Sequence, residues 1–230
     1  MKFKIILILL LVALLAITVE GGGKRRRRYK GRPTRTLIRK KYTTTTTKNP
    51  YCLTKNIERF RELSIEKMFD VLCLTETHIT EDIPDSKIKI NGFNMVQINS
   101  HSRRTGGVVI YVKNNLKFIV TTKECSTKAW IITIKIDEYA LNITGIYRSP
   151  SQKPSEFFQF LDSYIHKNLD CINDNQIIIG DMNLNVAKTQ ERKIKDYLNI
   201  LRRHDLIQVI TEYTRYDKKN NSSSIIVNNC

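Results

Sequence analysis

The sequence has few cysteines and histidines, and those it has stand far apart. The five cysteines are an odd number with no Cys-x-x-Cys pair: Cys52, Cys73, Cys125, Cys171 and Cys230. This spacing indicates neither a zinc motif nor a disulfide framework. The four histidines are predicted to lie at the surface or at helix ends, and none is assigned a function: His78, His101, His166 and His204.

Acidic residues are scarce as well, with 22 Asp and Glu against 39 Lys and Arg, which gives a formal net charge of +17. The imbalance is confined to one part of the chain. Residues 1–48 contain fourteen basic residues and one acidic residue, so residues 49–230 keep 25 basic and 21 acidic ones. The excess positive charge therefore belongs mostly to an N-terminal segment and not to the remainder of the chain.

The sequence also lacks an apolar run of ordinary membrane-spanning length. Residues 5–19 are apolar, but a helix needs about 20 such residues to cross a bilayer. Two lysines precede this run and Glu20-Gly-Gly-Gly follows it, which predicts a signal peptide over residues 1–20 and hence secretion. A signal anchor is the alternative. The basic run of residues 24–28 opposes export, because positive charge there favours the cytoplasmic side.

A basic, threonine-rich segment follows the leader. Residues 21–48 have high charge, little apolar content and five consecutive threonines, which predicts a disordered linker. Its basic part, from Lys24 to Lys48, is expected to bind polyanions by releasing their counterions, whatever their sequence. The alternative is a solvated linker or a proprotein segment that is cut at its basic run.

From residue 49 onward the pattern is that of a globular domain, and 41% hydrophobic residues exclude wholesale disorder. Helical spacing of apolar residues predicts helices over residues 56–68, from Pro154 with Ser155 as N-cap, and over residues 191–203. Apolar and β-branched runs predict strands over residues 70–74, 92–98, 108–112, 116–121, 130–136, 141–147, 176–179 and 208–210. Alternating strands and helices indicate an α/β layered domain.

Two of the predicted strands end in acidic residues. Three isoleucines at 177–179 predict a buried strand, and Gly180 is expected to end it so that Asp181 and Asn183 emerge in a loop. A carboxylate and a carboxamide two residues apart can reach one phosphate together. Glu76 follows the buried strand of residues 70–74 in the same way. Many strands end like this by chance, so the interpretation depends on partners elsewhere in the chain.

Six segments in order supply those partners, and together they resemble the endonuclease/exonuclease/phosphatase superfamily, the DNase-I-like fold. The resemblance is strongest to the apurinic-type endonuclease domain of non-LTR retrotransposons and covers residues 49–230. The segments are Asn49–Asn56, Asp70–Thr77, Arg104–Val112, Gly145–Pro150, Ile178–Asn183 and Tyr213–Arg215. The resemblance implies an α/β fold with a two-layer β-sandwich flanked by helices, DNA as partner, a monomer and no small-molecule cofactor.

The resemblance also implies roles for individual residues. Phosphodiester cleavage needs a divalent ion to neutralise charge on the phosphate, and Mg²⁺ is usually held by few carboxylates and several waters. Mg²⁺, with Mn²⁺ as a substitute, would be bound by Glu76 with help from Asn49. Asp181 would activate water or protonate the leaving oxygen, and Asn183 and the Tyr147 hydroxyl would donate hydrogen bonds to the phosphate. The residues expected at the nucleic-acid backbone are Arg148, Thr214 and Arg215.

Each of these residues taken alone has a structural interpretation. Glu76 would be an acid at a strand end, Tyr147 a packed aromatic and Asn49 a helix cap or turn. Arg148 and Arg215 would be solvated surface residues. It is the order of the six segments that favours the catalytic interpretation.

The chain departs from the family pattern near residue 230. In the family, Thr-Arg is followed by a Ser-rich turn and a strand of the type Ser-x-Ile-Asp-x-Ile, whose Asp orients the catalytic histidine. Here the corresponding residues are 222–230, and Val227 stands where that Asp is expected. The sequence ends before a Ser-Asp-His segment. We therefore expect a C-terminally truncated domain with weak or no turnover.

Two further expectations remain open at this point. A secreted basic protein that binds polyanions without catalysis is the alternative function. The leader predicts secretion, whereas the parent mobile element would act in the nucleus. On export, the sequons at Asn142 and at Asn220 or Asn221 would accept glycans, and the first is expected in a strand near the site, where a glycan is hard to reconcile with a working cleft.

Overall fold

The computed structural model describes residues 53–62, 69–126, 128–169, 175–209, 215–217 and 222–224. The predicted signal peptide, the linker, Asn49 and Thr214 lie outside these residues, as do Val227 and the sequons at Asn220 and Asn221. Within the described part of the chain, no helix is both long and apolar enough to span a bilayer.

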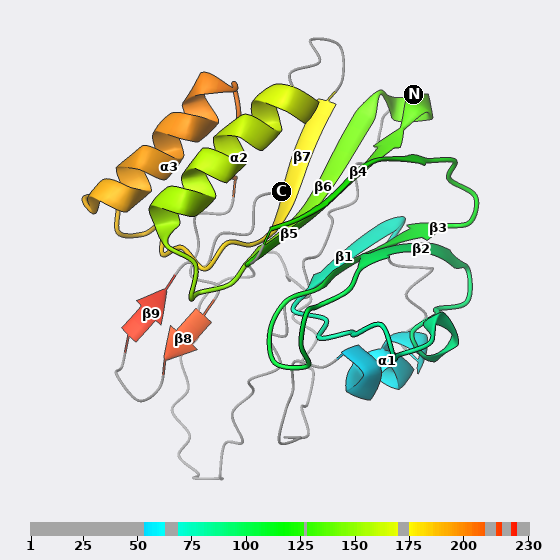
Figure 1. Cartoon of the computed structure of the whole chain (residues 1–230). Helices are drawn as coiled ribbons and strands as arrows, with labels where there is room; N and C mark the ends of the chain where they lie inside the picture. The colour runs from blue at the N-terminus through cyan, green and yellow to red at the C-terminus, as the bar shows by residue number, and fades with distance from the viewer. Residues whose placement is uncertain are drawn as a thin grey trace, which may run out of the picture.

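Two β-sheets face each other at the centre of the molecule (Figure 1). The first sheet is antiparallel with the order β1-β3-β2: β1 (Val71–Thr75), β2 (Phe93–Ile98) and β3 (Val108–Lys113). The second has the order β4-β5-β6-β7: β4 (Ile119–Cys125), β5 (Ala129–Ile136), β6 (Leu141–Arg148) and β7 (Asn175–Asp181). Its strands are antiparallel except for the parallel pair β6–β7.

Helices cover the outer faces of both sheets (Figure 1). Helices α2 (Pro154–Asn168) and α3 (Arg192–Arg203) cover the second sheet, and α1 (Leu53–Glu62) covers the first. Two short 3-10 turns, η2 (Asp85–Lys87) and η3 (Asp137–Tyr139), and a small hairpin of β8 (Arg215–Asp217) and β9 (Ser222–Ser224) complete the described elements. The predicted α/β fold with a two-layer β-sandwich flanked by helices is confirmed.

Strand β5 shows why the sheets pack in layers. Trp130, Ile132 and Ile134 point into the core between the sheets, whereas Ile131 points into the core beneath the helices. Successive strand side chains alternate between faces, so a strand buried on both sides must be apolar at every position. This is the reason that the apolar runs in the sequence predicted strands well.

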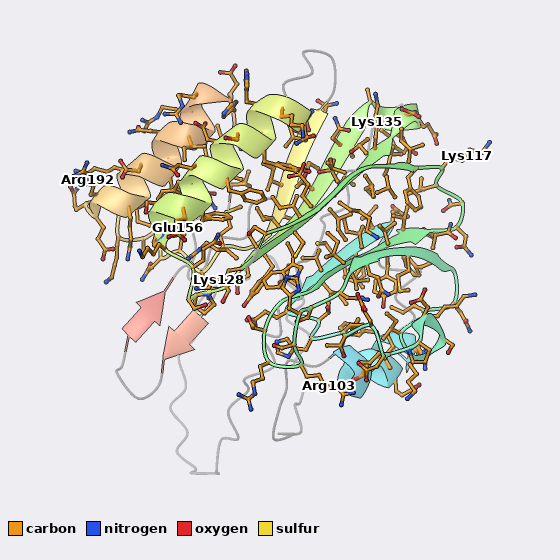
Figure 2. All side chains as sticks on the ribbon, viewed as in Figure 1. Arg103, Lys117, Lys128, Lys135, Glu156 and Arg192 are labelled. Atoms are coloured by element: carbon orange, nitrogen blue, oxygen red, sulfur yellow. The ribbon has the colours of Figure 1, made fainter. Side chains whose placement is uncertain are left out.

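The two helices over the second sheet are held by an apolar face and a small ionic cluster. In α3, Ile194, Tyr197 and Leu201 are buried at helical spacing against that sheet. At the end of α3, Arg203 and His204 contact Asp162 of α2 at 2.7 and 2.9 Å. Figure 2 shows labelled charged side chains that project outward, among them Lys117, Lys135 and Arg192.

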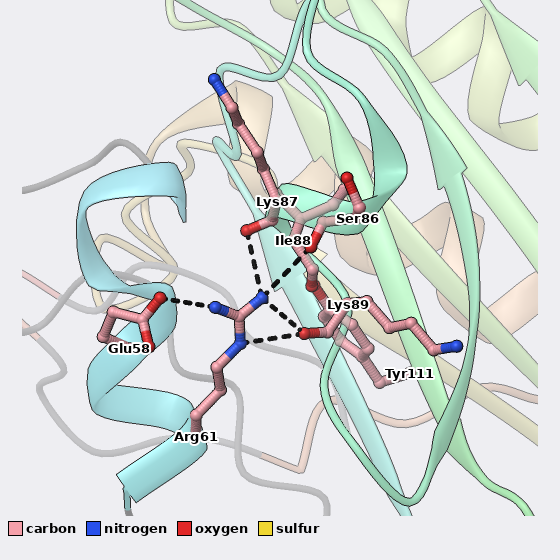
Figure 3. Close-up of polar contacts among 7 residues, drawn as sticks. All are labelled: Glu58, Arg61, Ser86, Lys87, Ile88, Lys89 and Tyr111. Atoms are coloured by element: carbon pink, nitrogen blue, oxygen red, sulfur yellow. Dashed lines mark hydrogen bonds and ion pairs between the residues drawn. The ribbon is translucent and has the colours of Figure 1, made fainter.

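A single arginine ties α1 to the segment beneath it. The Arg61 guanidinium donates to the carbonyls of Lys89, at 2.9 and 3.0 Å, and of Ser86 and Lys87, at 3.3 and 3.4 Å (Figure 3). Glu58 in the same helix accepts a further bond at 2.5 Å. These contacts fix α1 against the segment that leads into β2 of the first sheet.

Local differences from the expected elements have identifiable causes. Helix α1 begins at Leu53, earlier than the predicted start at residue 56. Helix α2 has Lys153 as its N-cap, because Pro154 occupies the first helical position that its fixed φ favours, so Ser155 is not the cap. The predicted strand at 208–210 is wrong for its described residues, because neighbouring Ile207 is 79% exposed and no strand pairs with this segment.

The sequon at Asn142 lies far from the predicted site. Asn142 is 5% exposed and is the second residue of β6, where it pairs with Lys135 of β5 and Gln176 of β7. Tyr147 lies five residues farther along the same strand, about 16 Å away at the usual rise of about 3.3 Å per residue. The expected proximity to the site is therefore wrong, and the folded domain has no room for a glycan at Asn142.

Candidate active site

The residues predicted to act on phosphate meet at one edge of the two sheets. Glu76 directly follows β1, Tyr147 is the penultimate residue of β6, and Asp181 is the last residue of β7. The parallel register places Tyr147 beside Asp181. The Tyr147 hydroxyl then bridges the two sheets by donating a hydrogen bond to Glu76 Oε1 at 2.6 Å. Three strand ends thus bring these side chains into one site.

Tyr147 is the buried link of this arrangement. Its side chain is fully buried, and its ring packs against Trp130 with the centroids 5.6 Å apart. Burial, followed by the hydrogen bond to Glu76, raises the pKa of the phenol well above its usual value. The hydroxyl therefore keeps its proton at neutral pH and donates a hydrogen bond to Glu76. This arrangement makes Tyr147 a support for the Glu76 carboxylate, where the sequence predicted a donor to the phosphate.

The backbone at this edge is strained. Glu76, His78 and Asn183 have φ of 53°, 55° and 50°, the left-handed region that non-glycine residues rarely adopt. For Glu76 this conformation costs about 1–2 kcal/mol relative to a relaxed backbone, whereas asparagine and histidine adopt it more readily. Strain of this kind persists only where surrounding contacts impose it, and it concentrates at functional sites.

The loop between β2 and β3 supplies those contacts for the Glu76 side. His78 N donates to Gly106 O at 3.1 Å, and Thr77 N donates to Gly107 O at 3.4 Å. A side chain at Gly106, whose φ is +97°, would overlap the Trp130 ring. On the other side, Leu53 N at the start of α1 donates to Thr77 O at 3.1 Å. The segment that carries Glu76 is therefore held between α1 and a glycine loop.

Asp181 and Asn183 form a compact unit at the end of β7. Asp181 is 4% exposed, and its Oδ1 accepts a hydrogen bond from Asn183 N at 2.8 Å. The Asn183 side chain donates from Nδ2 to Arg148 O at 2.7 Å, which leaves one N–H of the amide group for another acceptor. The side chains of this unit are thus oriented by the protein before any ligand binds.

Gly180 has a different role from the one predicted. Strand β7 continues through Gly180 to Asp181, so the glycine does not end the strand. A Cβ at this position would collide with the backbone carbonyl of Ile146 in β6. Glycine is needed here because the two parallel strands approach closely where they deliver Tyr147 and Asp181.

Arg148 is not a surface residue. It is 3% exposed, and its guanidinium donates only to backbone carbonyl oxygens: Met182 at 2.5 Å, Gln152 at 2.6 Å, Asn183 at 2.8 Å and Ser149 at 3.4 Å. The guanidinium also lies 5.7 Å from the centroid of the Phe157 ring. These contacts use four of the five N–H groups of the guanidinium and the side chain is almost entirely buried, so the predicted contact with the nucleic-acid backbone does not fit the structure.

His78 is 4% exposed, so the predicted surface position is wrong. Neither ring nitrogen has a hydrogen-bond partner in the described part of the chain. Burial lowers the pKa of the imidazole, and the nearby Glu76 carboxylate partly opposes that shift. Its position two residues after Glu76 was a signal in the sequence, but spacing alone did not reveal that both residues take left-handed backbone and turn inward.

Of the remaining predicted residues, only the backbone of Arg215 is described. It belongs to β8, where it pairs with Ser224 of β9. Asn49 and Thr214 lie outside the described residues, so their predicted roles stay predictions. The described site therefore consists of Glu76, Tyr147, Asp181 and Asn183.

Comparison with known proteins agrees with this geometry. Residues 22–219 match the endonuclease/exonuclease/phosphatase family. The chain belongs to this family. No match was found among curated protein sequences.

Solved structures of the family share the fold. An apurinic endonuclease from Archaeoglobus fulgidus is 18% identical, with a TM-score of 0.56 over 78% of this chain and 82% of that one. The endonuclease domain of TRAS1, a telomere-specific non-LTR retrotransposon, is 12% identical, with a TM-score of 0.51 over 76% and 78%. The 3′ phosphatase NExo from Neisseria, bound to a product DNA hairpin, is 14% identical, with a TM-score of 0.51 over 78% and 82%. At these identities the likeness shows the DNase-I-like fold.

The family generally depends on divalent metals, and Glu76 fits such an ion. Among the described residues no group of three or more His, Cys, Asp or Glu could hold a metal. Mg²⁺, however, is commonly bound by one or two carboxylates with several waters retained. Tyr147 engages only Oε1 of Glu76, and Oε2 has no hydrogen-bond partner within the described ranges. The donor chemistry therefore suits a hard, hydrated cation and not a site rich in nitrogen or sulfur.

Proposed function

We propose that this domain hydrolyses phosphodiester bonds in DNA with the help of a divalent cation, as an endonuclease of the non-LTR retrotransposon type. The observation that carries the proposal is the convergence of Glu76, Asp181 and Asn183 at one sheet edge, joined by the 2.6 Å hydrogen bond from Tyr147 to Glu76. Family membership of residues 22–219 supports the reaction class.

Glu76 would hold Mg²⁺ or Mn²⁺, with Asn49 as a second ligand. The ion would neutralise charge on the phosphate oxygens. The Tyr147 hydroxyl orients the carboxylate by occupying Oε1, which leaves Oε2 for the ion. The hydrogen bond from Leu53 N to Thr77 O supports this role for Asn49, because Leu53 is only four residues after Asn49 and Thr77 directly follows Glu76.

Asp181 and Asn183 would act on the phosphate itself. Asp181 is held by the Asn183 backbone amide at one carboxylate oxygen, and a buried carboxylate in that setting can take a proton from water or return one to the leaving oxygen. The free N–H of the Asn183 amide group would donate to a phosphate oxygen as negative charge develops there.

Binding of DNA would rest on residues outside this cluster. Thr214 and Arg215 remain proposed contacts to the sugar-phosphate backbone. The bound DNA hairpin of the 3′ phosphatase NExo from Neisseria supports DNA as the partner of this fold. We also propose a monomer that needs no small-molecule cofactor.

Turnover would be slow. Val227 replaces the Asp that orients the catalytic histidine in the family pattern, and residues that act as one unit lose orders of magnitude in rate when one member is removed. The proposed domain is therefore a weak nuclease, or one whose activity is lost, with the metal and phosphate residues retained.

A plasmid-nicking assay with Mg²⁺ tests this function. The wild-type chain is compared with Glu76→Gln and Asp181→Asn, and with Glu138→Gln, an exposed acid outside the site, as the matched control. We expect each site variant to reduce any nicking by about 100-fold or more, and the control to leave it unchanged. Nicking that persists in both site variants would contradict the proposed site. Robust wild-type nicking would contradict only the proposed slow turnover.

A second candidate function rests on the charge of the N-terminal segment, in which residues 1–48 hold fourteen of the 39 basic residues. We propose that residues 24–48 bind polyanions independently of catalysis and that the leader of residues 1–20 directs secretion. Heparin affinity should be lost when residues 24–48 are deleted. Unchanged, salt-sensitive binding by the deletion variant would contradict this role. Mass spectrometry of the N-terminus of the secreted chain would test the leader.

A further inference from the structure

Arg148 is a buried cation whose hydrogen-bond partners are all uncharged. A guanidinium that is 3% exposed has lost most of its hydration, which is costly unless the protein replaces it. Here four backbone carbonyl oxygens take the place of water. The Asp181 carboxylate provides the nearby negative charge that partly offsets burial. Arg148 therefore carries a desolvation cost at the end of β6.

The four carbonyls come from two segments that must be held together. Met182 and Asn183 belong to the loop that follows β7, and Ser149 and Gln152 belong to the turn between β6 and α2. One planar fork of donors thus connects the end of β6, the approach to α2 and the end of β7. A lysine could not replace it, because an ammonium group lacks the spread of five fixed N–H donors.

The connection is reciprocal. The Arg148 side chain donates to the Asn183 carbonyl at 2.8 Å, and the Asn183 side chain donates to the Arg148 carbonyl at 2.7 Å. Asn183 then donates its backbone N–H to Asp181 at 2.8 Å while holding a left-handed φ of 50°. Such a conformation needs external contacts to persist, and Arg148 provides them.

We propose that Arg148 is a positioning residue that holds Asn183 and Asp181 in the geometry required at the phosphate, and that it does not contact nucleic acid. This inference rests on the proposed function, because the loop it holds is the one assigned to the phosphate. Arg148 would then support the site from the protein interior, where neither its charge nor its surface exposure indicates that role.

The first test measures the loop without using activity. Hydrogen exchange of the Asn183 amide is compared in the wild-type chain, in Arg148→Lys and in the exposed control Arg192→Lys on α3. We expect about tenfold faster exchange in Arg148→Lys only, as for the loss of one or two hydrogen bonds to a charged group, with the amides of β1 and β3 unchanged. Unchanged exchange at Asn183 would overturn the proposal.

The amides of β1 and β3 also report whether the variant folds. If they lose protection in Arg148→Lys, Arg148→Gln, which keeps a planar donor group, is measured in its place. If both variants lose protection throughout the fold and the Asn183 amide is affected no more than the others, Arg148 serves only the stability of the core, and the proposal is overturned.

The second test separates positioning from contact. In the nicking assay, positioning predicts that Arg148→Lys lowers kcat by about 100-fold with KM unchanged and that added guanidinium ion partly restores the rate of Arg148→Gly. DNA affinity and its dependence on salt should stay as in the wild type. A weaker affinity with a smaller salt slope would instead show a phosphate contact and overturn the proposal. If the wild-type chain does not nick, its turnover is lost, as the proposed function allows, and the exchange measurement decides on Arg148.

Discussion

The two halves of the site are built in opposite ways. On the second sheet, Asp181, Asn183 and Arg148 satisfy one another through hydrogen bonds of 2.7 to 2.8 Å. On the first sheet, the segment that carries Glu76 has buried polar atoms without partners in the described part of the chain, including Thr75 Oγ1, Thr77 Oγ1 and both ring nitrogens of His78. In the Asp181 half the three residues bond to one another, whereas the Glu76 half has several buried polar groups that a ligand, ion or water would satisfy.

This difference shows which interactions stabilise or destabilise each half of the site. The Asp181 half is oriented by its own bonds, so it should resist change until one of those bonds is removed. Left-handed backbone occurs in both halves, at Glu76, His78 and Asn183, but in the Glu76 half it is combined with unpaired polar atoms, which favours binding of a partner over stability of the free protein. Substitutions in the two halves should therefore differ in sign as well as in size.

Gly180→Ala should have the largest effect, because it disturbs the backbone of the half that contains Asp181. The added Cβ collides with the Ile146 carbonyl, which cannot move without separating β6 from β7. We expect a loss of about 3 kcal/mol in the free energy of unfolding, as for overpacking at a rigid position. Urea denaturation measures it, with Lys123→Ala on the exposed edge strand β4 as control. A loss below that of the control would show that the strands can separate at no cost.

His78→Leu should change stability in the opposite direction, because it removes two unpaired buried nitrogens from the half that contains Glu76. We expect the free energy of unfolding to rise by about 1–3 kcal/mol, since an apolar group of similar size needs no hydrogen bonds. The exposed His166→Leu is the matched control in the same urea experiment. Destabilisation by His78→Leu would mean that the imidazole is satisfied in solution.

Tyr147→Phe would cut the link between the halves. The variant loses the hydrogen bond to Glu76 but keeps the packing against Trp130. We expect a loss of about 1–2 kcal/mol in stability, because the bond is made to a charged group. Calorimetric titration with Mg²⁺ should show altered affinity, because Glu76 is no longer oriented. Identical stability and Mg²⁺ affinity in the variant and the wild type would show that the bridge is dispensable.

Acid should weaken the fold through His78. The folded pKa is lowered, so the unfolded chain binds more protons between the folded pKa and the ordinary value of 6.5, and stability rises with pH across that window. Stability should thus be complete above about pH 6.5 and fall as the pH drops below it. Urea midpoints between pH 5 and pH 7 measure the slope. The slope should be shallower in His78→Leu, and an equal slope would assign it to other groups.

Asp162→Asn should have the smallest effect, because it lies between α2 and α3 and not at the site. The Arg203 contact and then the His204 contact lower the pKa of Asp162, but the carboxylate is largely solvent-accessible. We expect a loss of about 0.5 kcal/mol and unchanged nicking. A loss of nicking larger than the loss of stability explains would contradict this prediction and show that the contact between α2 and α3 influences the site.

The comparison also separates what was predictable from what was not. The existence of the two buried strands that lead to Glu76 and Asp181 was predictable, because short apolar runs bounded by polar residues indicate buried strands, although β7 continues past the predicted end to Asp181. The inward turn of His78 and the burial of Arg148 were not. Both depend on contacts with distant segments, the glycine loop at 106–107 for His78 and the Met182–Asn183 carbonyls for Arg148.

By itself the sequence determined the layered α/β fold, the family and the side chains available for a phosphate site, because hydrophobic periodicity and the order of short motifs are local properties. Only the tertiary structure decided which of those side chains face one another. It turned Tyr147 toward Glu76, buried Arg148 beneath Asn183 and kept Gly180 inside β7, because burial and hydrogen bonding are settled between segments that are far apart in the chain.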